Sequence, residues 1–578
     1  MTDFIHGFVI ISLMLMVMAG YGESTFGSGF YWKQIATINK TIKNCKIAIL
    51  VCSMVLLSSV STYAQMTGKQ IDSVVNKAMS TIDNTVGFAI GVVKDGQIVH
   101  VKGYGLNSID SNETVTADTP FGIASNSKAF TSAALAILVD QGKIKWEDKV
   151  IAYIPEFKMY NDYVTNNFNI HDLLTHRSGL GIGAGDLMIF PNGSNFTIHD
   201  VLNAFQYFKP TTAFRTKFDY DNLLYLVAGE LTARVSGKSW ETFVDEEILK
   251  PLEMHDSYAR YYYALKHGNI AVAHSFDGKT LNAIQNPKPN SKQKMNGAAG
   301  GIWSSANDMC KWMLAHLNEG KYGTGLDKTL FSEQQQQEMW RVHTPMNKQS
   351  DPRSPFKSHF SGYGLGWFLS DFNGFFKVEH SGLIAGMSSE VTLIPELELG
   401  IVVLNNSEGA GFLNGLMGFV LLDEYLNLET GINWLEMAQG MQQHGQQIGD
   451  PDAEKVWSKV EANKDVKIDK PKYIGVYRDN WFGKVEVYDK GGELWFKSHK
   501  SPRLNGKMEF YEDNTFAIKW EYQDMKADAL AIFSLDNSGT AQTIKMKGIS
   551  GFIDFSFDFQ DLDLRRVLES PTDSGIKK

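Results

Sequence analysis

The segment 125–142 places the strongest constraint on how this 578-residue chain can fold. Its apolar side chains, including Phe130, Ile137 and Leu138, are so closely spaced that a helix here must be buried around most of its circumference. Gly142 ends the pattern, and glycine most often terminates a helix in the left-handed conformation. We therefore expect a buried helix, preceded by the short apolar stretch 119–124.

Two polar side chains stand at the start of this apolar helix. Ser125 and Lys128 are three residues apart, so both lie on one face of the first turn. Burial and the positive end of the helix dipole both disfavour the lysine ammonium, which leaves a neutral amine that can act as a base near neutral pH. The pair therefore predicts an activated serine nucleophile.

The Ser-x-x-Lys pattern is weak by itself, because the chain contains four copies of it. The other three lie in polar, Pro/Gly-rich or terminal sequence, where a serine is usually an ordinary loop hydroxyl. Helical context favours the copy at Ser125, and partner residues elsewhere are needed to support it. The other copies are Ser291 to Lys294, Ser354 to Lys357 and Ser574 to Lys577.

The composition is that of a folded protein, with 43% hydrophobic and 21% charged residues. The net charge is −10 and there is no basic stripe, which argues against nucleic-acid binding. The sequence has no Cys-x-x-Cys, His-Glu-x-x-His or nucleotide-binding glycine motif, so we expect no metal and no cofactor. Cys45 and Cys52 lie in the leader described next, which leaves Cys310 without a disulfide partner.

Residues 1–64 have the character of a leader. A basic stretch precedes the apolar run 47–60 and the small residue Ala64, a pattern that predicts a signal peptide cleaved after Ala64. A second apolar run, 8–19, is either an extra membrane segment or non-native translation upstream of the true start, and we favour the latter. We expect an exported chain, periplasmic or extracellular, whose only means of membrane contact is this N-terminal leader.

Strands are predicted on both sides of a mainly helical region, about 143–340. A β-hairpin at 86–104, around an Asp-Gly turn, precedes that region. The strand at 400–405 is nearly all apolar and should be buried on both faces. We expect both sets of strands to share one sheet in a domain spanning 66–430, followed by a helical linker at 431–470. The other predicted strands after the helical region are 363–369, 375–379 and 388–394.

Within the helical region, two segments look alike. Asn169 and Thr197 each open a helix as an N-cap residue, with an acid three residues later. The neighbouring His171 and His199 are therefore expected to be first-turn surface residues rather than ligands.

The last hundred residues alternate apolar and polar side chains over short spans separated by turn residues. This pattern predicts an antiparallel meander closed into a small barrel at 471–570. The barrel supplies none of the residues singled out for chemistry, so we expect it to shape substrate access or oligomerisation. The predicted strands are 473–477, 484–488, 493–497, 508–511, 515–520, 530–534 and 552–564.

Two further segments could complete a site around Ser125. Tyr220 and Asn222 lie on a loop just before a helical run, where a phenol can face a pocket, and a nearby lysine would favour the phenolate. His380-Ser381-Gly382 ends a strand, where a glycine lets a substrate lie close along the strand edge and leaves backbone N–H groups free. Core packing is the alternative for Tyr220, and each segment is weak alone.

In this order, Ser125-x-x-Lys128, Tyr220-x-Asn222 and His380-Ser-Gly382 resemble the motifs of penicillin-recognising serine hydrolases, in particular the class C β-lactamase-related branch. The likeness extends to 173–180, 299–306 and 363–366. It implies an α+β fold: a β-lactamase/transpeptidase-like antiparallel sheet with flanking helices and an all-helical subregion, plus the C-terminal antiparallel β-barrel. The tail is similar to the lipocalin-like barrel that some of these hydrolases append.

The resemblance also implies a mechanism through an acyl-enzyme. Ser125 would attack a carbonyl, while Lys128 and Tyr220 take its proton and return it to the leaving group. Asn222 would bind Lys128 or the substrate amide. The substrate oxyanion would sit on the backbone N–H groups of Ser125 and Leu383.

The third motif departs from the Lys-Thr/Ser-Gly of β-lactamases and cell-wall peptidases. Because His380 should be mostly neutral at pH 7, it attracts a substrate carboxylate less than lysine does. We therefore favour an esterase or a hydrolase of D-amino-acid peptides over a β-lactamase or D-Ala-D-Ala carboxypeptidase. A penicillin-binding sensor without turnover is the alternative of another class. The sequence names neither the small-molecule or peptide substrate, cell-wall derived or not, nor the oligomeric state.

Overall fold

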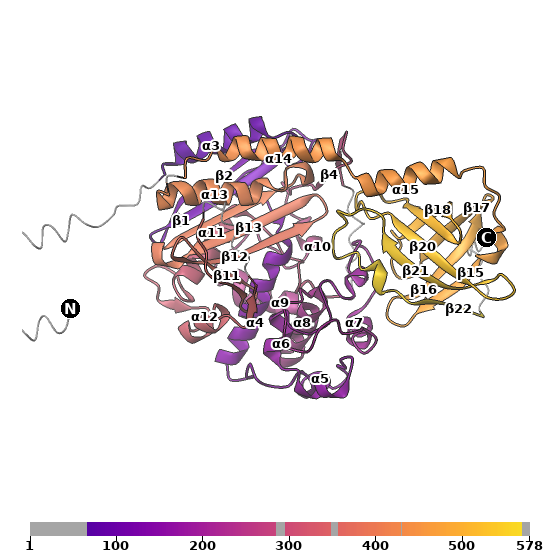
Figure 1. Ribbon diagram of the computed structural model, residues 1–578. Coiled ribbons are helices and arrows are strands. Elements are labelled where there is room, and N and C mark those ends of the chain that lie inside the picture. The colour runs from indigo at the N-terminus through magenta and orange to yellow at the C-terminus, as the bar shows by residue number, and fades with distance from the viewer. Residues whose placement is uncertain (1–65, 285–294, 348–355, 429, 569–578) are drawn as a thin grey trace, which may run out of the picture. The chain divides into compact units, whose positions relative to one another are not determined.

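The computed structural model describes residues 66–568 apart from 285–294, 348–355 and 429 (Figure 1). The predicted leader with its signal peptide, the Ser-x-x-Lys copies at 291 and 574, and Ser354 of the remaining copy lie outside the described residues. Within the described residues, none of the helices is long and apolar enough to cross a membrane. Cys310 is the one cysteine described, and it is buried and unpaired.

An eight-stranded antiparallel sheet forms the centre of the first domain, in the order β2-β1-β14-β13-β12-β11-β10-β9. The N-terminal hairpin meets the C-terminal strands where β1 pairs with β14, from Phe88 opposite Asn405 to Lys94 opposite Leu399. This pairing confirms that strands on both sides of the helical region share one sheet. The bounds are β1 (Gly87–Lys94), β2 (Gln97–Gly105), β9 (Thr344–Met346), β10 (Ser361–Tyr363), β11 (Phe368–Phe372), β12 (Phe375–Ile384), β13 (Met387–Ile394) and β14 (Leu399–Asn405).

The predicted strand 363–369 is wrong, because the chain turns between β10 and β11. Gly366 has a φ of +82°, and a Cβ there would lie 2.9 Å from the Lys128 carbonyl oxygen. The turn therefore needs glycine both for its backbone conformation and for its close approach to the helix that carries Lys128.

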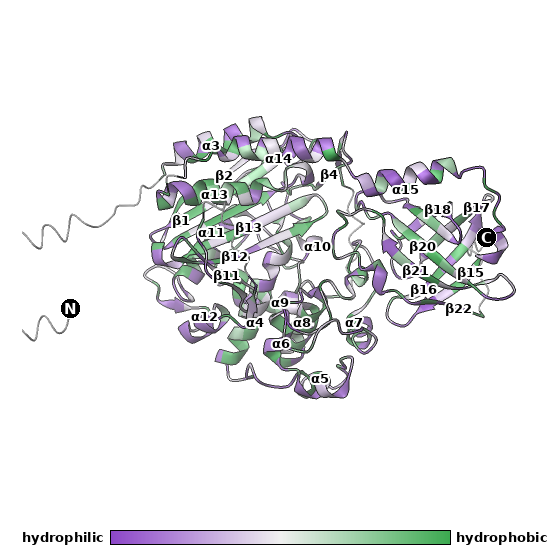
Figure 2. Ribbon diagram, viewed as in Figure 1, coloured by the Kyte–Doolittle hydropathy of each residue, from purple (hydrophilic) through white to green (hydrophobic). Residues whose placement is uncertain are grey.

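Both faces of the sheet are covered, so β14 is buried along its whole length, as predicted. Alternate residues of β1 and β14 point to opposite faces. Ile90 and Val403 pack with α3 (Gly68–Thr81), α13 (Leu413–Leu426) and α14 (Trp434–Ile448), whereas Ala89 and Val402 face the core around α4. Figure 2 shows the resulting mixture of polar and apolar residues along the outer helices α3 and α14.

The helix predicted from 125 is present at the centre of the helical subregion. A short 3₁₀ turn, η1 (Ala124–Asn126), leads into α4 (Ser127–Asp140), and Gly142 follows with a φ of +67°. Every residue from Ser127 to Leu138 is buried, which confirms the expectation of a helix covered on all sides. The neighbouring helices are α5 (Asp162–Asn167), α6 (Ile170–Leu174), α7 (Ile198–Ala204), α8 (Asn222–Ser236), α9 (Trp240–Val244), α10 (Tyr261–Ala264), α11 (Ala306–Leu317) and α12 (Glu333–Met339).

The predicted N-caps are present, but one of the two first-turn histidines is not on the surface. Asn169 and Thr197 both make capping boxes with the acids three residues later. His199 is exposed as expected, whereas His171 is buried and stacks on Trp146. The prediction for His171 is wrong because the 330–345 segment folds back over the start of α6, a tertiary contact that helix periodicity does not reveal.

The segment 431–470 is helical, but it does not form one separate linker. Its first helix, α14, packs on α3 and α13 of the sheet domain. The second, α15 (Pro451–Ala462), packs on β18 and β19 of the barrel. Each helix thus belongs to the domain it covers, and the chain passes from one to the other at 449–450.

The C-terminal strands form a closed barrel in sequence order, which confirms the predicted architecture. The predicted strand 552–564 is wrong: most of this segment is a loop, and a strand not predicted, β21, precedes it. The bounds are β15 (Gly475–Asp479), β16 (Gly483–Lys490), β17 (Glu493–Ser498), β18 (Asn505–Glu512), β19 (Thr515–Trp520), β20 (Ala529–Leu535), β21 (Ala541–Gly548) and β22 (Leu564–Val567).

Candidate active site

Ser125 lies in the tight turn η1 at the start of α4, where its side chain is partly exposed. The preceding residue, Ala124, has a φ of +47°, a left-handed conformation that alanine rarely adopts. Hydrogen bonds hold the turn: Ile123 N–H donates to the Ile302 oxygen at 3.0 Å, and Ile302 N–H donates to Ser127 Oγ at 3.0 Å. A strained turn held in this way fixes the direction of the Ser125 hydroxyl.

Lys128 is fully buried, and its Nζ lies 3.0 Å from Ser125 Oγ. Nζ also lies 2.7 Å from Asn222 Oδ1 and 2.9 Å from the Ala299 carbonyl oxygen. These two oxygens can only accept, so they take both N–H groups of a neutral amine and leave its lone pair for the Ser125 hydroxyl proton. Burial lowers the pKa of Lys128 to about 7, against the opposing effect of nearby carboxylates.

Tyr220 closes the site over Lys128. Its ring centroid lies 4.8 Å from Lys128 Nζ, and the Ser125 hydroxyl is near enough to favour the phenolate by hydrogen bonding. Burial nevertheless raises the pKa of Tyr220 well above its usual value. The sequence-based expectation of a favoured phenolate is therefore wrong, since desolvation outweighs the effect of a lysine that is itself easily neutralised.

Asn222, the first residue of α8, is oriented by a second polar contact. Its Nδ2 donates to Asp186 Oδ2 at 2.7 Å, so its amide oxygen faces Lys128. The N-cap of α8 is Asp221, whose side chain accepts the Leu224 N–H. Burial raises the pKa of Asp221 to about 7 and that of Asp186 well above its usual value. Burial thus shifts both carboxyl groups, like Lys128, toward their neutral forms.

Strand β12 passes directly beside η1 because Gly382 has no side chain. A Cβ at Gly382 would lie 2.2 Å from the Ile123 carbonyl oxygen, so any other residue would push the strand away. In the part of the chain that the structure describes, β12 pairs only with β13 beyond Glu379, which leaves its other edge open. Ser125 and the 60% exposed Leu383 flank this contact, where the two predicted oxyanion N–H donors would be needed.

His380 lies in the site but has no free hydrogen-bonding group. Its Nδ1 is 2.6 Å from the Ser381 carbonyl oxygen, which can only accept, so Nδ1 carries the proton. Its Nε2 then carries no proton and accepts a hydrogen bond from the Tyr363 hydroxyl, 3.0 Å away. Burial and the charge of Lys128 lower the pKa of His380 to about 3. Its imidazole is therefore neutral and already satisfied on both sides.

The side chain of Ser381 lies away from Lys128. Ser381 pairs with Glu390 in the register of β12 and β13, and paired residues share a face of the sheet. Glu390 points toward α13, where its carboxylate lies 3.6 Å from the Cβ position of Gly415. The side chain of Leu383, two residues further along β12, lies on the same face, so of the sequence-predicted residues Ser381 and Leu383 are the two whose side chains do not join the others.

Three contributors were missed by sequence reasoning. Asp186, the Ala299 carbonyl and Tyr363 carry no motif of their own, although 299–306 and 363–366 belong to segments that prompted the family resemblance. Asp186 lies in a glycine-rich loop without periodicity, so the sequence held no usable signal for it.

A second polar cluster lies apart from this site. His171 Nε2 is 2.8 Å and His343 Nε2 is 3.2 Å from Glu338 Oε1, a grouping of types that bind metals. Arg341 donates to the same oxygen at 2.6 Å and already neutralises the carboxylate. We therefore interpret the cluster as a structural hydrogen-bond network.

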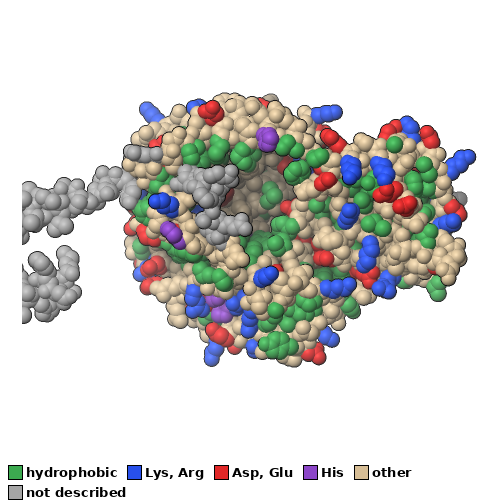
Figure 3. Space-filling view, in the orientation of Figure 1, with side chains coloured by type: hydrophobic (Ala, Val, Ile, Leu, Met, Phe, Trp, Pro, Cys, Tyr) green, Lys and Arg blue, Asp and Glu red, His purple; other side chains and the backbone are tan. Residues whose placement is uncertain are grey.

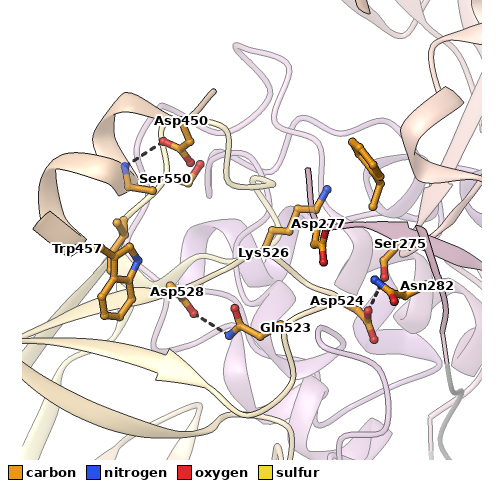
Figure 4. A pocket seen from close by; sticks show the side chains of 13 residues that line it. Ser275, Asp277, Asn282, Asp450, Trp457, Gln523, Asp524, Lys526, Asp528 and Ser550 are labelled. Atoms are coloured by element: carbon orange, nitrogen blue, oxygen red, sulfur yellow. Dashed lines mark hydrogen bonds between the residues drawn. The ribbon is translucent and has the colours of Figure 1, made fainter. Parts of the chain in front are cut away.

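A cavity of about 340 Å³ lies where residues 275–282 meet α15 and the barrel (Figure 4). Several carboxylates line it, but each accepts hydrogen bonds from neighbouring protein groups. Asp528 accepts from Gln523, as Figure 4 shows, and Asp450 caps α15. None of the residues around Lys128 lines this cavity.

Two family models match the chain. Residues 75–417 match the family described as Beta-lactamase. The matched segment is more than half of the chain and contains all residues of the site described above. Residues 470–566 match a family described as Domain of unknown function (DUF3471). The second match corresponds to the barrel.

Curated relatives resemble the first domain. "Unguisins hydrolase ungD'" of Aspergillus campestris is 28% identical over 352 residues, which are 59% of this chain and 62% of that protein. "Protein flp" of Staphylococcus aureus is 27% identical over 343 residues, 58% of this chain and 63% of that protein. The chain thus spans less than two thirds of the length of either relative.

Among solved structures, the octameric penicillin-binding protein homologue from Pyrococcus abyssi has a similar fold. It aligns with a TM-score of 0.54 and 21% identity over 86% of this chain and 100% of that one. The family match, the sheet with its helical subregion and the Ser125–Lys128 pair agree. The chain therefore belongs to the Beta-lactamase family, whose members share the β-lactamase fold of serine hydrolases.

Proposed function

We propose that this protein hydrolyses uncharged esters or amides through an acyl-enzyme on Ser125. The observation that carries the proposal is the environment of Lys128 Nζ, which is 3.0 Å from Ser125 Oγ and faces two oxygens that can only accept. Burial there favours the neutral amine. A neutral amine beside a serine hydroxyl is what general-base activation of a nucleophile requires.

In the proposed reaction, Ser125 Oγ attacks the substrate carbonyl carbon and its proton passes to Lys128 Nζ. The backbone N–H groups of Ser125 and Leu383 stabilise the oxyanion that forms. Collapse of the tetrahedral intermediate breaks the bond to the leaving alcohol or amine, which receives the proton from Lys128. Because its phenol stays protonated, Tyr220 serves as a neutral relay for that proton rather than as a base.

Water completes the cycle by the same path in reverse. It loses a proton to Lys128, attacks the acyl carbon and releases the acid, and the proton returns to Ser125 Oγ.

The substrate class follows from the absence of a cationic anchor at the third motif. His380 is neutral, buried and satisfied at both ring nitrogens, which supports substrates without a carboxylate next to the scissile bond. The exposed apolar side chain of Ile182 lies beside the site, since the N–H of the neighbouring Gly183 donates to the Tyr220 carbonyl oxygen at 2.8 Å. The relative named as a hydrolase of unguisins lends support to substrates other than β-lactams in this family. We thus favour an esterase or peptide hydrolase, including hydrolysis of D-amino-acid peptides.

We also propose that the protein works outside the cytoplasm. The basis is the signal-like pattern of residues 40–64, which precedes the first described residue. Immunoblotting of cell fractions for the full chain would test this, and an unprocessed cytoplasmic product would contradict it.

A substrate panel tests the proposed reaction. Wild type and Ser125→Ala would be compared on short-chain p-nitrophenyl esters, D-aminoacyl amides, D-Ala-D-Ala peptides and nitrocefin. We expect turnover of the uncharged esters or amides by wild type, at least about 10³-fold above Ser125→Ala, with melting temperatures nearly equal.

Three outcomes would change the proposal. Nitrocefin turnover equal to ester turnover would reverse the substrate preference. A permanent penicillin adduct on Ser125, with no turnover of any substrate, would indicate a sensor. Equal rates for wild type and Ser125→Ala would remove Ser125 as the nucleophile.

A further inference from the structure

A segment of the barrel reaches the catalytic pocket of the sheet domain. Residues 550–558 connect β21 to the end of the barrel, and Asp558 within this segment is fully buried. Its Oδ2 accepts the Gly185 N–H at 2.8 Å, and its Oδ1 accepts the Leu187 N–H at 2.9 Å. A side chain from the C-terminal domain thus holds the backbone of a loop in the other domain.

The two N–H groups that Asp558 binds flank Asp186. They open the short 3₁₀ turn Asp186–Met188, so Asp558 acts as its cap from another domain. The turn starts at Gly185, with a φ of +81° and only 2.4 Å between a Cβ position there and the Phe208 ring. A residue other than glycine would clash there, and the two hydrogen bonds to Asp558 hold the turn that determines where Asp186 points.

The position of Asp186 matters because it sets which end of the Asn222 amide faces Lys128. Asp186 Oδ2 accepts the Asn222 Nδ2 at 2.7 Å, which turns the amide oxygen toward Lys128 Nζ. If Asp186 moved, the amide could rotate and turn its NH₂ group toward the lysine. The N–H groups of Lys128 would then face another donor and lose their acceptor. The contacts thus run from Asp558 through Asp186 and Asn222 to Lys128.

Phe555 of the same segment forms part of the pocket wall. Its ring packs edge-on against Tyr220, with centroids 5.8 Å apart, and lies 2.8 Å from the Cβ position of Gly183. Phe555 is 45% exposed overall, and the nearby Ile182 is 53% exposed. One edge of the ring therefore covers a residue of the site while the rest is open to a bound molecule. Figure 3 shows a hollow in this view of the molecule with hydrophobic side chains on its rim.

Separate contacts hold the barrel against the sheet domain. Lys500 Nζ binds Asp200 at 2.8 Å, and the Lys500 carbonyl oxygen accepts the Asn195 N–H at 2.6 Å. Lys526 binds Glu408 at 3.0 Å on another side. The segment 550–558 therefore approaches the pocket from a barrel that is docked at several places.

We propose that barrel residues 555–558 complete the active site: Asp558 positions Asp186, and Phe555 forms an apolar wall that binds the acyl side of the substrate. The preferred substrates would then carry an aromatic or branched apolar acyl group. This inference rests on the proposed function, because the wall and the lysine serve the same serine.

The positioning role of Asp558 is tested by a double-mutant cycle in the full-length protein. Asp558→Asn, Asp186→Asn and the double variant would be compared on p-nitrophenyl acetate over pH 5–9. We expect Asp558→Asn to lower kcat at least ten-fold. Asp186 raises the pKa of Lys128, so its displacement in this variant should move the pH midpoint of kcat/KM downward. In the Asp186→Asn background, the same substitution should have little further effect.

A purely structural role for Asp558 predicts a different pattern. The melting temperature would fall, the pH midpoint would stay, and the two substitutions would add in the cycle, which would overturn the positioning role. Hydrogen–deuterium exchange of 183–188 is measured without substrate. It should rise in Asp558→Asn even if Ser125 proved not to be the nucleophile, and unchanged exchange would overturn the role of Asp558 in holding this turn.

The wall is tested with Phe555→Ala and a matched control from the same segment, Phe552→Ala, whose side chain is 74% exposed. We expect Phe555→Ala to lower kcat/KM for p-nitrophenyl 3-phenylpropionate about ten-fold while that for p-nitrophenyl acetate changes less than two-fold. Phe552→Ala should change neither. Equal losses on both esters, or none, would overturn the wall. A failure of the wall is distinguished from a failure of the proposed function by Ser125→Ala. If that variant loses all turnover while wild type still prefers the phenylpropionate ester, the proposed function stands whatever Phe555→Ala shows.

Discussion

The side chains inside the barrel and those around Lys128 in the catalytic pocket are both buried, but they differ in kind. In the barrel, Phe516 and Phe533 pack edge to face, with ring centroids 5.7 Å apart, and Tyr473 packs on both. In the pocket, Lys128 and Asp186 are equally buried and touch polar partners. Burial thus stabilises the first region, whereas in the second it changes which protonation state is favoured.

This difference follows from the free energy of taking groups out of water. Burying apolar surface is favourable by about 25 cal/mol per Å². Burying a charge is costly, so buried ionisable groups shift toward their neutral forms. The pKa of Lys128 is lowered to about 7 and the pKa values of Asp186 and Asp558 are raised, as that rule requires. Substitutions in the two regions should accordingly have opposite consequences for stability and activity.

The largest effect should come from Lys128→Met. Loss of the base should lower kcat for an ester by about 10⁴-fold. The wild-type lysine binds a proton in the unfolded chain between pH 7 and about 10 but not in the folded one, so wild-type stability rises with pH across that window. Methionine does not bind a proton, so the variant lacks this contribution to the pH dependence of stability. Denaturant unfolding at pH 7 and pH 9 should therefore show the free energy of unfolding of wild type rising, relative to that of Lys128→Met, by roughly 1 kcal/mol per pH unit.

The exposed Lys143, just after α4, provides the control. Lys143→Met should leave both kcat and the pH dependence of stability unchanged. If the stabilities of Lys128→Met and wild type changed in parallel between pH 7 and pH 9, the lysine would have an ordinary affinity for protons in the folded state, and the explanation from burial would fail.

The opposite response is expected in the barrel. Phe516→Ala removes a fully buried ring and should lower the free energy of unfolding by about 3–5 kcal/mol. The kcat of the protein that remains folded, measured well below its melting temperature, should equal that of wild type. Ile532→Ala, at a position 39% exposed, should cost far less stability. A loss of kcat in Phe516→Ala at full folding would show that barrel packing and catalysis cannot be separated.

The sequence predicted the catalytic pair because its spacing is local. One helical turn brings Ser125 and Lys128 together whatever surrounds them, and the 3.0 Å distance follows. Tyr220 and Asn222 depended on recognising a family pattern, since nothing local indicates which pocket a loop will face. Ser381 was placed in the site by its motif, yet strand alternation turns its side chain to the α13 face.

Contacts between distant segments could not be predicted in this way. The run from Ile553 to Phe559 alternates apolar and polar residues as an amphipathic strand does, so the sequence favoured a strand at 552–564. In the structure most of it is a loop whose Asp558 is turned inward to backbone N–H groups of another domain. The partners of Asp558 are more than 370 residues away, and only the folded arrangement brings them together.

The smallest and most direct test of the pocket is its pH profile. For an uncharged ester, kcat/KM of wild type should rise about ten-fold per pH unit up to about 7 and then level off, as Lys128 loses its proton. Asp221 titrates in the same range, and its negative charge holds the proton on Lys128. Asp221→Asn keeps an N-cap for α8 but removes that charge, so the rising limb should move to lower pH. The other titratable groups around Lys128 are Asp186, His176, Tyr220, Tyr225 and His380. A limb that stayed in place, or moved to higher pH, would show that the limb does not belong to Lys128, and the activating role of the buried amine would have to be given up.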